Sequence, residues 1–238
     1  MQTGTIPENL AGIEERIASA ARRSGRPRQE IQLVAVSKKV PWPLILQAAA
    51  GGQRLMGESY IQEARDKIAL ARATGEGRRL AWHFIGHLQS NKAELAVDLF
   101  EVIESVDRLK VARALDNRAA VRGKMQKVLV QVNIGHEPQK SGIMVDDCEN
   151  LLRAMQDQCR HLRVLGLMAI PPWTTDPEAS RPHFRAMRLT AEELGARELL
   201  GDRGRAELSM GMSADFEVAI EEGATLVRVG TALFGPRP

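Results

Sequence analysis

The chain has 238 residues, of which 44% are hydrophobic and 26% are charged. These proportions are typical of a globular protein with a full core, and they exclude an extended disordered chain. The formal net charge is only +3, with no run of five or six like charges, which argues against a nucleic-acid-binding function.

Targeting segments and metal sites are not indicated by the sequence. The first residues include Pro7 and several polar side chains before any apolar run, so we expect no secretory signal. No apolar run approaches the roughly 20 residues that span a membrane. Cys148 and Cys159 fall at helical spacing on one apolar stripe, as buried core thiols would, and the histidines show no metal-site spacing. We therefore expect a cytoplasmic protein without a metal.

The spacing of the apolar residues predicts an N-terminal helix, followed by strands that alternate with helices. Residues 8–22 read as a helix, with Leu10, Ile13 and Ile17 on one face and Gly25 as a stop. Short apolar strands are predicted at 33–38, 54–57, 80–85, 100–105, 127–134, 163–170, 207–210 and 226–229. Helical patterns between them cover 44–50, a segment carrying Ile61, Ala64 and Ile68, then 109–120, 145–159, 178–194 and 215–222.

Eight strands that alternate with helices predict an α/β fold with a parallel sheet, and their number predicts a closed TIM (β/α)8 barrel with an extra N-terminal helix. The alternative is an open doubly wound sheet. It is disfavoured because no Gly-x-Gly-x-x-Gly turn follows the first strand. No linker rich in Pro, Gly or Ser interrupts the pattern, so residues 1–238 are expected to form one domain.

The first predicted strand ends in a lysine. Val34 and Val36 suit a strand that is buried on both faces, and Lys38 shares their parity, so its side chain would enter the barrel mouth. An ammonium there loses solvation, its pKa falls, and the neutral amine becomes a nucleophile toward carbonyl carbon. This is the chemistry of a Schiff-base lysine. The alternative is that Lys38 and Lys39 begin a solvated loop, which this stretch alone would favour, and the rest of the sequence argues against that alternative.

Two further strand ends carry groups that suit a phosphate. After the seventh strand, Ser213 is placed as a helix N-cap, and Gly211 would let the backbone approach a ligand. After the eighth strand, Gly230 and Thr231 can add backbone N–H groups and a hydroxyl. Barrels of this type often hold phosphate at these two loops, so we predict an anion site here.

Arg228 also needs an explanation. It shares strand parity with Leu226 and would point into the barrel, where an unpaired guanidinium is costly. Its partner could be an inward carboxylate, for which Glu58 and Glu104 are the candidates at strand ends, or the ring nitrogen of a ligand.

His83 and Met168 are ambiguous by themselves. His83 lies on an otherwise apolar strand and is either a satisfied core residue or a site residue. Met168 lies near the mouth, where it either packs on a flat ring or fills the core. Downstream of His83, Asn91 and Glu94 are predicted to form a capping box for the next helix.

Specific short motifs recur at the strand ends in a defined order. They are Ala35-Val36-Ser37-Lys38, Gly57-Glu58-Ser59-Tyr60, Trp82-His83-Phe84-Ile85-Gly86, Leu88-Gln89-Ser90-Asn91-Lys92, Lys140-Ser141-Gly142, Gly166-Leu167-Met168-Ala169-Ile170, Ser209-Met210-Gly211-Met212-Ser213 and Val227-Arg228-Val229-Gly230-Thr231. Together, over nearly the whole chain, they resemble the pyridoxal phosphate homeostasis protein family. That family is similar to the barrel domain of alanine racemase.

The resemblance implies a cofactor and a set of residues that bind it. The cofactor would be pyridoxal 5'-phosphate (PLP), held as a Schiff base on Lys38, with Arg228 facing the pyridine nitrogen. Ser59 stands where the family usually has Asn, so a hydroxyl would replace a side-chain amide contact, and His87 stands where Pro is common. The phosphate would be surrounded by Ser209, Gly211, Met212, Ser213, Gly230 and Thr231, and the ring would be lined by His83 and Met168.

The function that the resemblance implies is intracellular PLP homeostasis, in which the protein holds PLP and delivers it to PLP-dependent apoenzymes without turnover, so that no residue is assigned as catalytic. One alternative is an amino-acid racemase or decarboxylase on the same barrel. It is disfavoured because Arg228 keeps its proton and would leave the pyridine nitrogen a poorer electron sink. A Schiff-base aldolase that uses Lys38 without a cofactor would leave Arg228 unexplained.

The racemases that this barrel resembles also use a second base, a tyrosine supplied by a separate β domain. The sequence ends just after the eighth predicted strand, and its one tyrosine is Tyr60, next to a predicted helix start. The racemases dimerise through that β domain, so we expect a monomer here, with no nucleic-acid or membrane partner.

Overall fold

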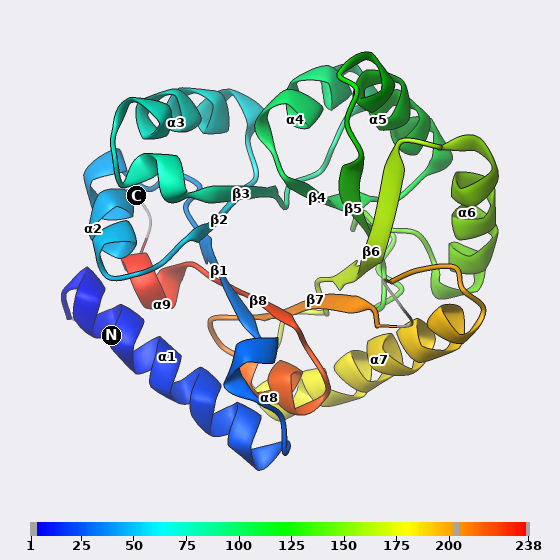
Figure 1. The fold of residues 1–238 in the computed structure, drawn as a ribbon. Coiled ribbons are helices and arrows are strands. Elements are labelled where there is room, and N and C mark those ends of the chain that lie inside the picture. Colours follow the sequence, from blue (N-terminus) through cyan, green and yellow to red (C-terminus); the bar gives the residue numbers. More distant parts are fainter. Residues whose placement is uncertain (1–3, 202–204, 237–238) are drawn as a thin grey trace.

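Eight parallel strands close into a barrel in the order β1-β2-β3-β4-β5-β6-β7-β8, with helices around the outside (Figure 1). This is seen in a computed structural model that describes residues 4–201 and 205–236. β1 pairs with β2 on one side and with β8 on the other, which closes the ring. The predicted barrel is confirmed, and the open doubly wound sheet is excluded.

The strands match the predicted segments to within two residues at each end. They are β1 (Gln32–Val36), β2 (Leu55–Glu58), β3 (Ala81–Phe84), β4 (Val102–Val106), β5 (Gln126–Val132), β6 (Leu162–Ala169), β7 (Glu207–Met212) and β8 (Leu226–Val229).

The helices cover the barrel between successive strands. They are α1 (Ile6–Arg23), α2 (Trp42–Ala50), α3 (Ile61–Ala73), α4 (Ala93–Leu99), α5 (Leu109–Val121), α6 (Val145–Gln158), α7 (Arg181–Ala196), α8 (Phe216–Glu221) and α9 (Thr231–Phe234), with short 3-10 turns at Arg28–Glu30, Gly77–Arg79, Ser90–Lys92 and Pro177–Ser180. The short α9 lies at a position where only a loop was expected.

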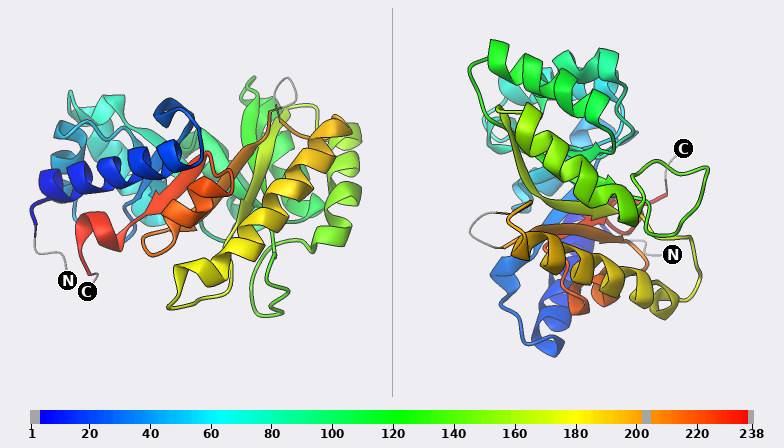
Figure 2. Two further views of the ribbon diagram at one scale, coloured as in Figure 1. Left: turned by 90° about the horizontal axis from the view of Figure 1, so that it is seen from below. Right: turned by 90° about the vertical axis from the view of Figure 1, so that its right-hand side faces the viewer.

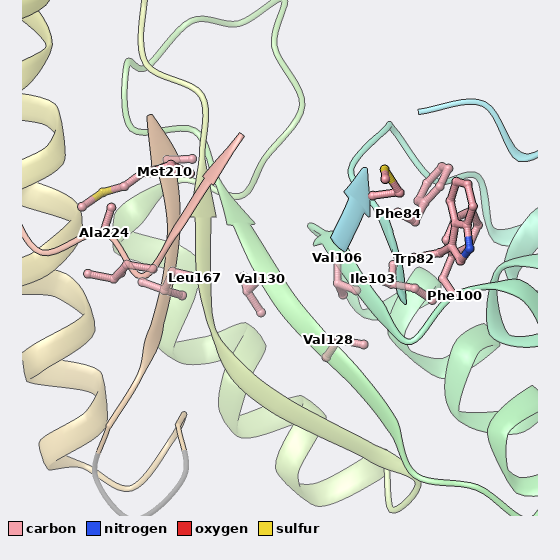
Figure 3. Packing of buried hydrophobic residues seen from close by; sticks show 14 of the residues in the cluster. Trp82, Phe84, Phe100, Ile103, Val106, Val128, Val130, Leu167, Met210 and Ala224 are labelled. Carbon is pink, nitrogen blue, oxygen red and sulfur yellow. The ribbon is translucent and has the colours of Figure 1, made fainter. Parts of the chain in front are cut away.

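Each strand buries both faces, as its nearly continuous apolar sequence requires. The outward faces pack under the helices in one large cluster, part of which is shown in Figure 3, where Trp82 and Phe84 of β3 lie beside Phe100. The Phe84 and Phe100 rings have centroids 5.1 Å apart. The inward faces form a second, smaller cluster inside the barrel, made of Val34, Leu55, Val102, Leu129, Met168 and Leu226.

The predicted N-terminal helix is present as α1 and adds to the eight strand–helix units. It buries Leu10, Ile13 and Ile17 on one face and lies along the outside of the barrel against α8 and α9 (Figure 2). Asn9 Nδ2 donates to the carbonyl of Leu233 at 3.0 Å, which ties α1 to α9. The last helix is therefore fixed by the first.

One predicted helix start is wrong. Asn91 and Glu94 do not form a capping box, because Ser90–Lys92 is a 3-10 turn and the N-cap position of α4 is Lys92, without a side-chain capping bond. The tight turn takes up the residues that would otherwise have supplied the cap.

Two expectations from composition can be compared with the structure. Cys148 and Cys159 are buried and unbridged, and burial raises their pKa values to about 12 and about 11. Across residues 4–201 and 205–236, none of the helices has the length and apolar character needed to cross a membrane.

Candidate functional site

A cleft of about 450 Å3 opens at the carboxyl ends of the strands. Two of the predicted site residues, Lys38 and Ser59, lie in its wall. The full lining is Lys38, Ser59, Tyr60, Ile85, Gly86, His87, Gln131, Lys140, Ser141 and Ile170. This is the end of the barrel at which active sites of this fold are built.

Lys38 reaches the cleft because of strand parity. Val34, four residues earlier, belongs to the inward cluster, and Lys38 is half-buried in a turn directly after β1. Lys39 is exposed and does not line the cleft; its backbone is left-handed, with φ of 59°. The predicted phase of this strand is confirmed.

A buried polar network forms the inward face above the apolar cluster. Arg228 on β8 donates from Nη1 to Ser209 Oγ at 2.6 Å and from Nη2 to the carbonyl of Ala169 at 2.8 Å. Ser209 on β7 in turn donates to Glu104 Oε2 on β4. The other carboxylate oxygen, Glu104 Oε1, lies 2.6 Å from His83 Nδ1 on β3. Arg228 is therefore linked to a carboxylate through a serine hydroxyl.

The charges of this network compensate one another. Burial by itself would raise the pKa of Glu104, but the hydrogen bond and charge of His83, with Arg228 and Ser209, outweigh it and lower that pKa below its usual value. Burial lowers the pKa of the Arg228 guanidinium below its usual value, and the carboxylates of Glu104 and Asp215 act in the opposite direction. Because a guanidinium keeps its proton in proteins, we treat this as a buried charge pair.

Glu104 is thus the carboxylate that Arg228 requires, and Glu58 is not. Glu58 is fully buried on β2, but Ser37 Oγ donates to its Oε1 at 2.8 Å, and Lys67 of α3 does so from the outside of the barrel. Sequence parity could have separated the two candidates: Glu104 has the parity of the inward Val102, whereas Glu58 has that of Met56, which packs under the helices.

Ser213 has a different role from the one predicted. Asp215, not Ser213, occupies the N-cap position of α8, and Asp215 Oδ1 accepts from the N–H of Met212 at 2.7 Å. Ser213 Oγ instead accepts from the N–H groups of Gly230 at 3.4 Å and Ala232 at 3.3 Å, at the start of α9. The loops after β7 and β8 are therefore held together by the Ser213 hydroxyl.

Gly211 is required for packing. Its φ is 88°, and a Cβ there would lie 2.5 Å from Ala219 Cβ and 2.9 Å from Phe216 Cα, so α8 could not approach. The sequence predicts that Gly211 lets the backbone approach a ligand, whereas the structure shows a packing reason for a glycine at this position. Met212 ends β7, and Thr231 is exposed at the first position of α9.

Met168 lies within the barrel. It is fully buried in the inward cluster and is paired in register with Ser209. It therefore lies next to the polar network.

Several residues that line the cleft were not predicted as site residues. His87 Nδ1 lies 3.0 Å from Ser141 Oγ, and Gln131 Nε2 donates to the carbonyl of Ser141 at 3.1 Å, so the loop after β5 is tied to the loop after β3 and to β5 itself. Gly86 allows a close approach, since a Cβ there would lie 2.2 Å from the carbonyl oxygen of Ser59. Gln131 could have been found from parity, because it lies two residues after the inward Leu129.

These groups offer a defined chemistry. A half-buried amine lies at the end of β1, a buried guanidinium lies on the adjacent β8, and hydroxyls lie on the loops after β7 and β8. Val34 of β1 pairs with Arg228 of β8, so the amine and the guanidinium belong to neighbouring strands. The arrangement fits a ligand with a carbonyl carbon, a basic ring atom and an anionic group.

Comparison with known proteins shows the family to which the chain belongs. Residues 9–238 match the model of the alanine racemase N-terminal domain family, and the chain belongs to that family. Within it, the chain belongs with the pyridoxal phosphate homeostasis proteins. It is 43% identical over 235 residues to the protein of that name from Pseudomonas aeruginosa, covering 98% of this chain and 96% of the relative. It is 40% identical to the Pasteurella multocida protein, covering 98% of each.

Several solved structures have a fold similar to that of this chain. PipY of Synechococcus elongatus, solved with PLP bound, is 40% identical with a TM-score of 0.79, over 94% of this chain and 100% of that one. A protein of unknown function from Bifidobacterium adolescentis is 33% identical with a TM-score of 0.88, over 97% and 94% of the two chains. An alanine racemase from Clostridium difficile shares the fold, with a TM-score of 0.70 at 12% identity over 98% of this chain and 60% of that one.

Proposed function

We propose that this protein binds PLP and serves intracellular PLP homeostasis, with Lys38 holding the cofactor covalently. The observation that carries the proposal is the placement of Lys38 in the cleft, in the turn after β1, the strand that pairs with the β8 strand of the buried Arg228. The pyridoxal phosphate homeostasis proteins and the PLP-bound PipY structure support it, because each aligns with nearly the whole chain.

The residues present fit this cofactor. When bound, PLP supplies an aldehyde that condenses with a lysine amine to give a C=N bond and water. Lys38 Nζ would supply the amine, and Arg228, bonded to Ser209 and through it to Glu104, would donate to the ring nitrogen. The phosphate would be held by Ser213, Thr231 and the backbone around Gly211, Met212 and Gly230, beside Ser209, while Ser59, His83 and Met168 would flank the ring.

The covalent link can be tested directly. The purified protein loaded with PLP should absorb in the visible range, and borohydride reduction followed by peptide mapping should find the label on Lys38. Lys38→Ala should abolish the absorption, whereas Lys39→Ala should retain it, because Lys39 is exposed and outside the cleft. A label on Lys39, or no label on either lysine, would contradict the proposal.

The protein is proposed to be a carrier that passes PLP to apoenzymes in the cytoplasm. Holding the cofactor would need only the contacts above, and the Lys38 amine would be regenerated on release, because condensation of an amine with an aldehyde is reversible. Incubating the loaded protein with a PLP-dependent apoenzyme, with free PLP scavenged, should restore activity faster than the scavenged control. Equal rates would argue against direct delivery.

We further propose that the carrier is a monomer. Among the described residues, exposed large apolar side chains such as Tyr60, Val121, Met125, Trp173 and Leu189 come from several different segments, which supports the proposal because an obligate dimer buries a broad apolar face. Sedimentation equilibrium should give the mass of one chain, 26.2 kDa. A stable dimer would contradict this.

An amino-acid racemase or decarboxylase is the second candidate. One observation favours it: His83 Nδ1 is held by Glu104 at 2.6 Å, as in a histidine prepared for proton transfer.

A further inference from the structure

The two residues that flank Lys38 are both anchored from outside the barrel. The Ser37 hydroxyl donates to Glu58 Oε1 at 2.8 Å, and its carbonyl accepts from Lys67 Nζ at 2.5 Å. The N–H of Lys39 donates to Glu63 Oε1 at 2.5 Å. The turn that carries Lys38 is thus fixed on both sides by side chains of β2 and α3.

Lys67 is the centre of this cluster. Its side chain is only 9% exposed, and its ammonium meets three acceptors: the carbonyl of Ser37, Glu58 Oε1 and Glu63 Oε1, the last at 2.5 Å. Three acceptors match the three N–H donors of a lysine. The lysine therefore links the strand, the helix and the turn through a single atom.

Stability alone does not account for the cluster. A buried ion pair is often no better than apolar side chains of the same volume. Glu58 Oε2 is buried without a hydrogen-bond partner in the described part of the chain, and burial raises the pKa of Glu58 despite the opposing charge of Lys67. Lys39 in addition takes a left-handed backbone that is uncommon outside glycine. The cluster therefore contains unfavourable features that stability does not explain, and its contacts fix the turn at 37–39.

We propose that Lys67, Glu58 and Glu63 are positioning residues that hold the turn at 37–39 so that the Lys38 amine is directed into the cleft. The inference rests on the proposed function, since it concerns the lysine that would hold PLP. A rotation of this turn by one residue would exchange Lys38 for Lys39 at the cleft, and Ser37 and Lys39 are the residues whose anchors prevent it.

The test separates covalent from non-covalent binding. Each variant is titrated with PLP, followed by visible absorption, and with pyridoxine 5'-phosphate, which has no aldehyde and cannot form the C=N bond. The variants are Lys67→Met, Glu63→Ala and Glu63→Gln. Arg65→Met is the matched control, because Arg65 lies on the same helix with its side chain 58% exposed.

Lys67→Met and Glu63→Ala should slow C=N formation by roughly tenfold to a hundredfold, as a misplaced reacting group does, while the affinity for pyridoxine 5'-phosphate stays near that of wild type. Glu63→Gln should recover most of the rate, because its amide oxygen can still accept from Lys39 N–H and Lys67. Arg65→Met should behave as wild type.

The outcomes are distinguishable. The positioning role would be overturned if Glu63→Ala formed the C=N bond at the wild-type rate, or if it lost equal affinity for PLP and for pyridoxine 5'-phosphate. In either case, visible absorption by the wild-type protein with PLP would still support PLP binding. A wild-type protein without visible absorption would instead overturn the proposed function and the inference with it. If Lys67→Met does not fold, Glu63→Ala still decides, because Glu63 is partly exposed.

Discussion

A buried guanidinium is stable in this barrel because each of its neighbours supplies one complementary group. Arg228, Ser209, Glu104 and His83 come from four different strands and alternate donor with acceptor. The serine hydroxyl is the essential intermediate, since it accepts from the guanidinium and donates to the carboxylate. The network thereby keeps the guanidinium charge balanced by a carboxylate inside the barrel, one residue before the end of β8.

Removing the charge of Glu104 tests whether the stability of the fold depends on this network. Glu104→Gln keeps the size of the side chain but leaves Arg228 without its carboxylate, so we expect the free energy of unfolding at neutral pH to fall by about 3 to 5 kcal/mol. The surface variant Glu94→Gln, which loses only an exposed pair with Arg118, should change it by less than about 1 kcal/mol. Urea unfolding measures both.

The same variant has a defined pH dependence. The pKa of Glu104 is lowered in the folded protein, so its contribution is present above the unfolded value near 4.5 and is lost as the pH falls through the folded value. The difference in unfolding free energy between wild type and Glu104→Gln should therefore shrink below about pH 4. A difference that stays constant down to that pH would mean that the ionised carboxylate is not what stabilises the fold.

Ser213 permits a test of the phosphate position. In Ser213→Asp a carboxylate can still accept from the N–H groups of Gly230 and Ala232, so the fold should persist. Like charges at about 4 Å cost on the order of 1 to 4 kcal/mol at effective dielectrics of about 80 down to 20. PLP affinity should drop by roughly tenfold or more, whereas pyridoxal, which lacks the phosphate, should bind as before. Equal losses for the two ligands would place the phosphate elsewhere.

At the scale of elements, the fold depends on a helix outside the strand–helix repeat. α1 buries Ile17 completely and, through Asn9, holds the carbonyl of Leu233 in α9. The start of α9 is in turn bound by Ser213 from the loop after β7. Thus the N-terminal helix supports the loops at which the phosphate is proposed to bind.

Shortening one side chain of α1 should destabilise the barrel. Ile17→Ala removes fully buried methyl groups, and we expect a loss of about 2 to 5 kcal/mol in the free energy of unfolding. Leu189→Ala on α7, where the side chain is half-exposed, should lie within about 0.5 kcal/mol of wild type. A small effect of Ile17→Ala would show that α1 unfolds separately from the barrel.

Local sequence predicted the strands well because their apolar runs and parity are local properties. Parity also placed Lys38 and Arg228 on the inward face. Parity could not reveal that Ser213 would bind the N–H groups at the start of α9. That contact joins Ser213 to residues 17 and 19 positions further along the chain, and it depends on the packing of β7 beside β8. Likewise, the link from Arg228 through Ser209 to Glu104 depends on the register of three strands.

At the scale of the whole molecule, the barrel interior holds both an apolar cluster and a polar network. The cluster consists of Val34, Leu55, Val102, Leu129, Met168 and Leu226, and the His83–Glu104–Ser209–Arg228 network adjoins it, since Ser209 pairs in register with Met168 and Leu226. Each member of the network is hydrogen-bonded to another strand, and the charge of Arg228 is balanced by Glu104. A network fixed in this way suits holding a cofactor in one place.

We therefore expect the protein to bind PLP but not to racemise alanine or other common amino acids faster than free PLP does. Arg228 keeps its proton, so in the proposed complex it would donate to the ring nitrogen and leave it unprotonated, which would weaken the ring as an electron sink. Lys38 could serve one face of a bound amino acid. His83 is the residue that could defeat this prediction, since its ring, held by Glu104, could act as a second base.

Exchange of the α-proton with solvent deuterium is the decisive measurement, because it detects abstraction by a single base before any inversion. Slow exchange that survives His83→Ala and is lost in Lys38→Ala would leave Lys38 acting alone, as expected of a carrier with incidental reactivity. Fast, saturable exchange that is lost in both variants would show that His83, held by Glu104, acts as a second base. The protein would then be an enzyme, which would contradict the proposed carrier function.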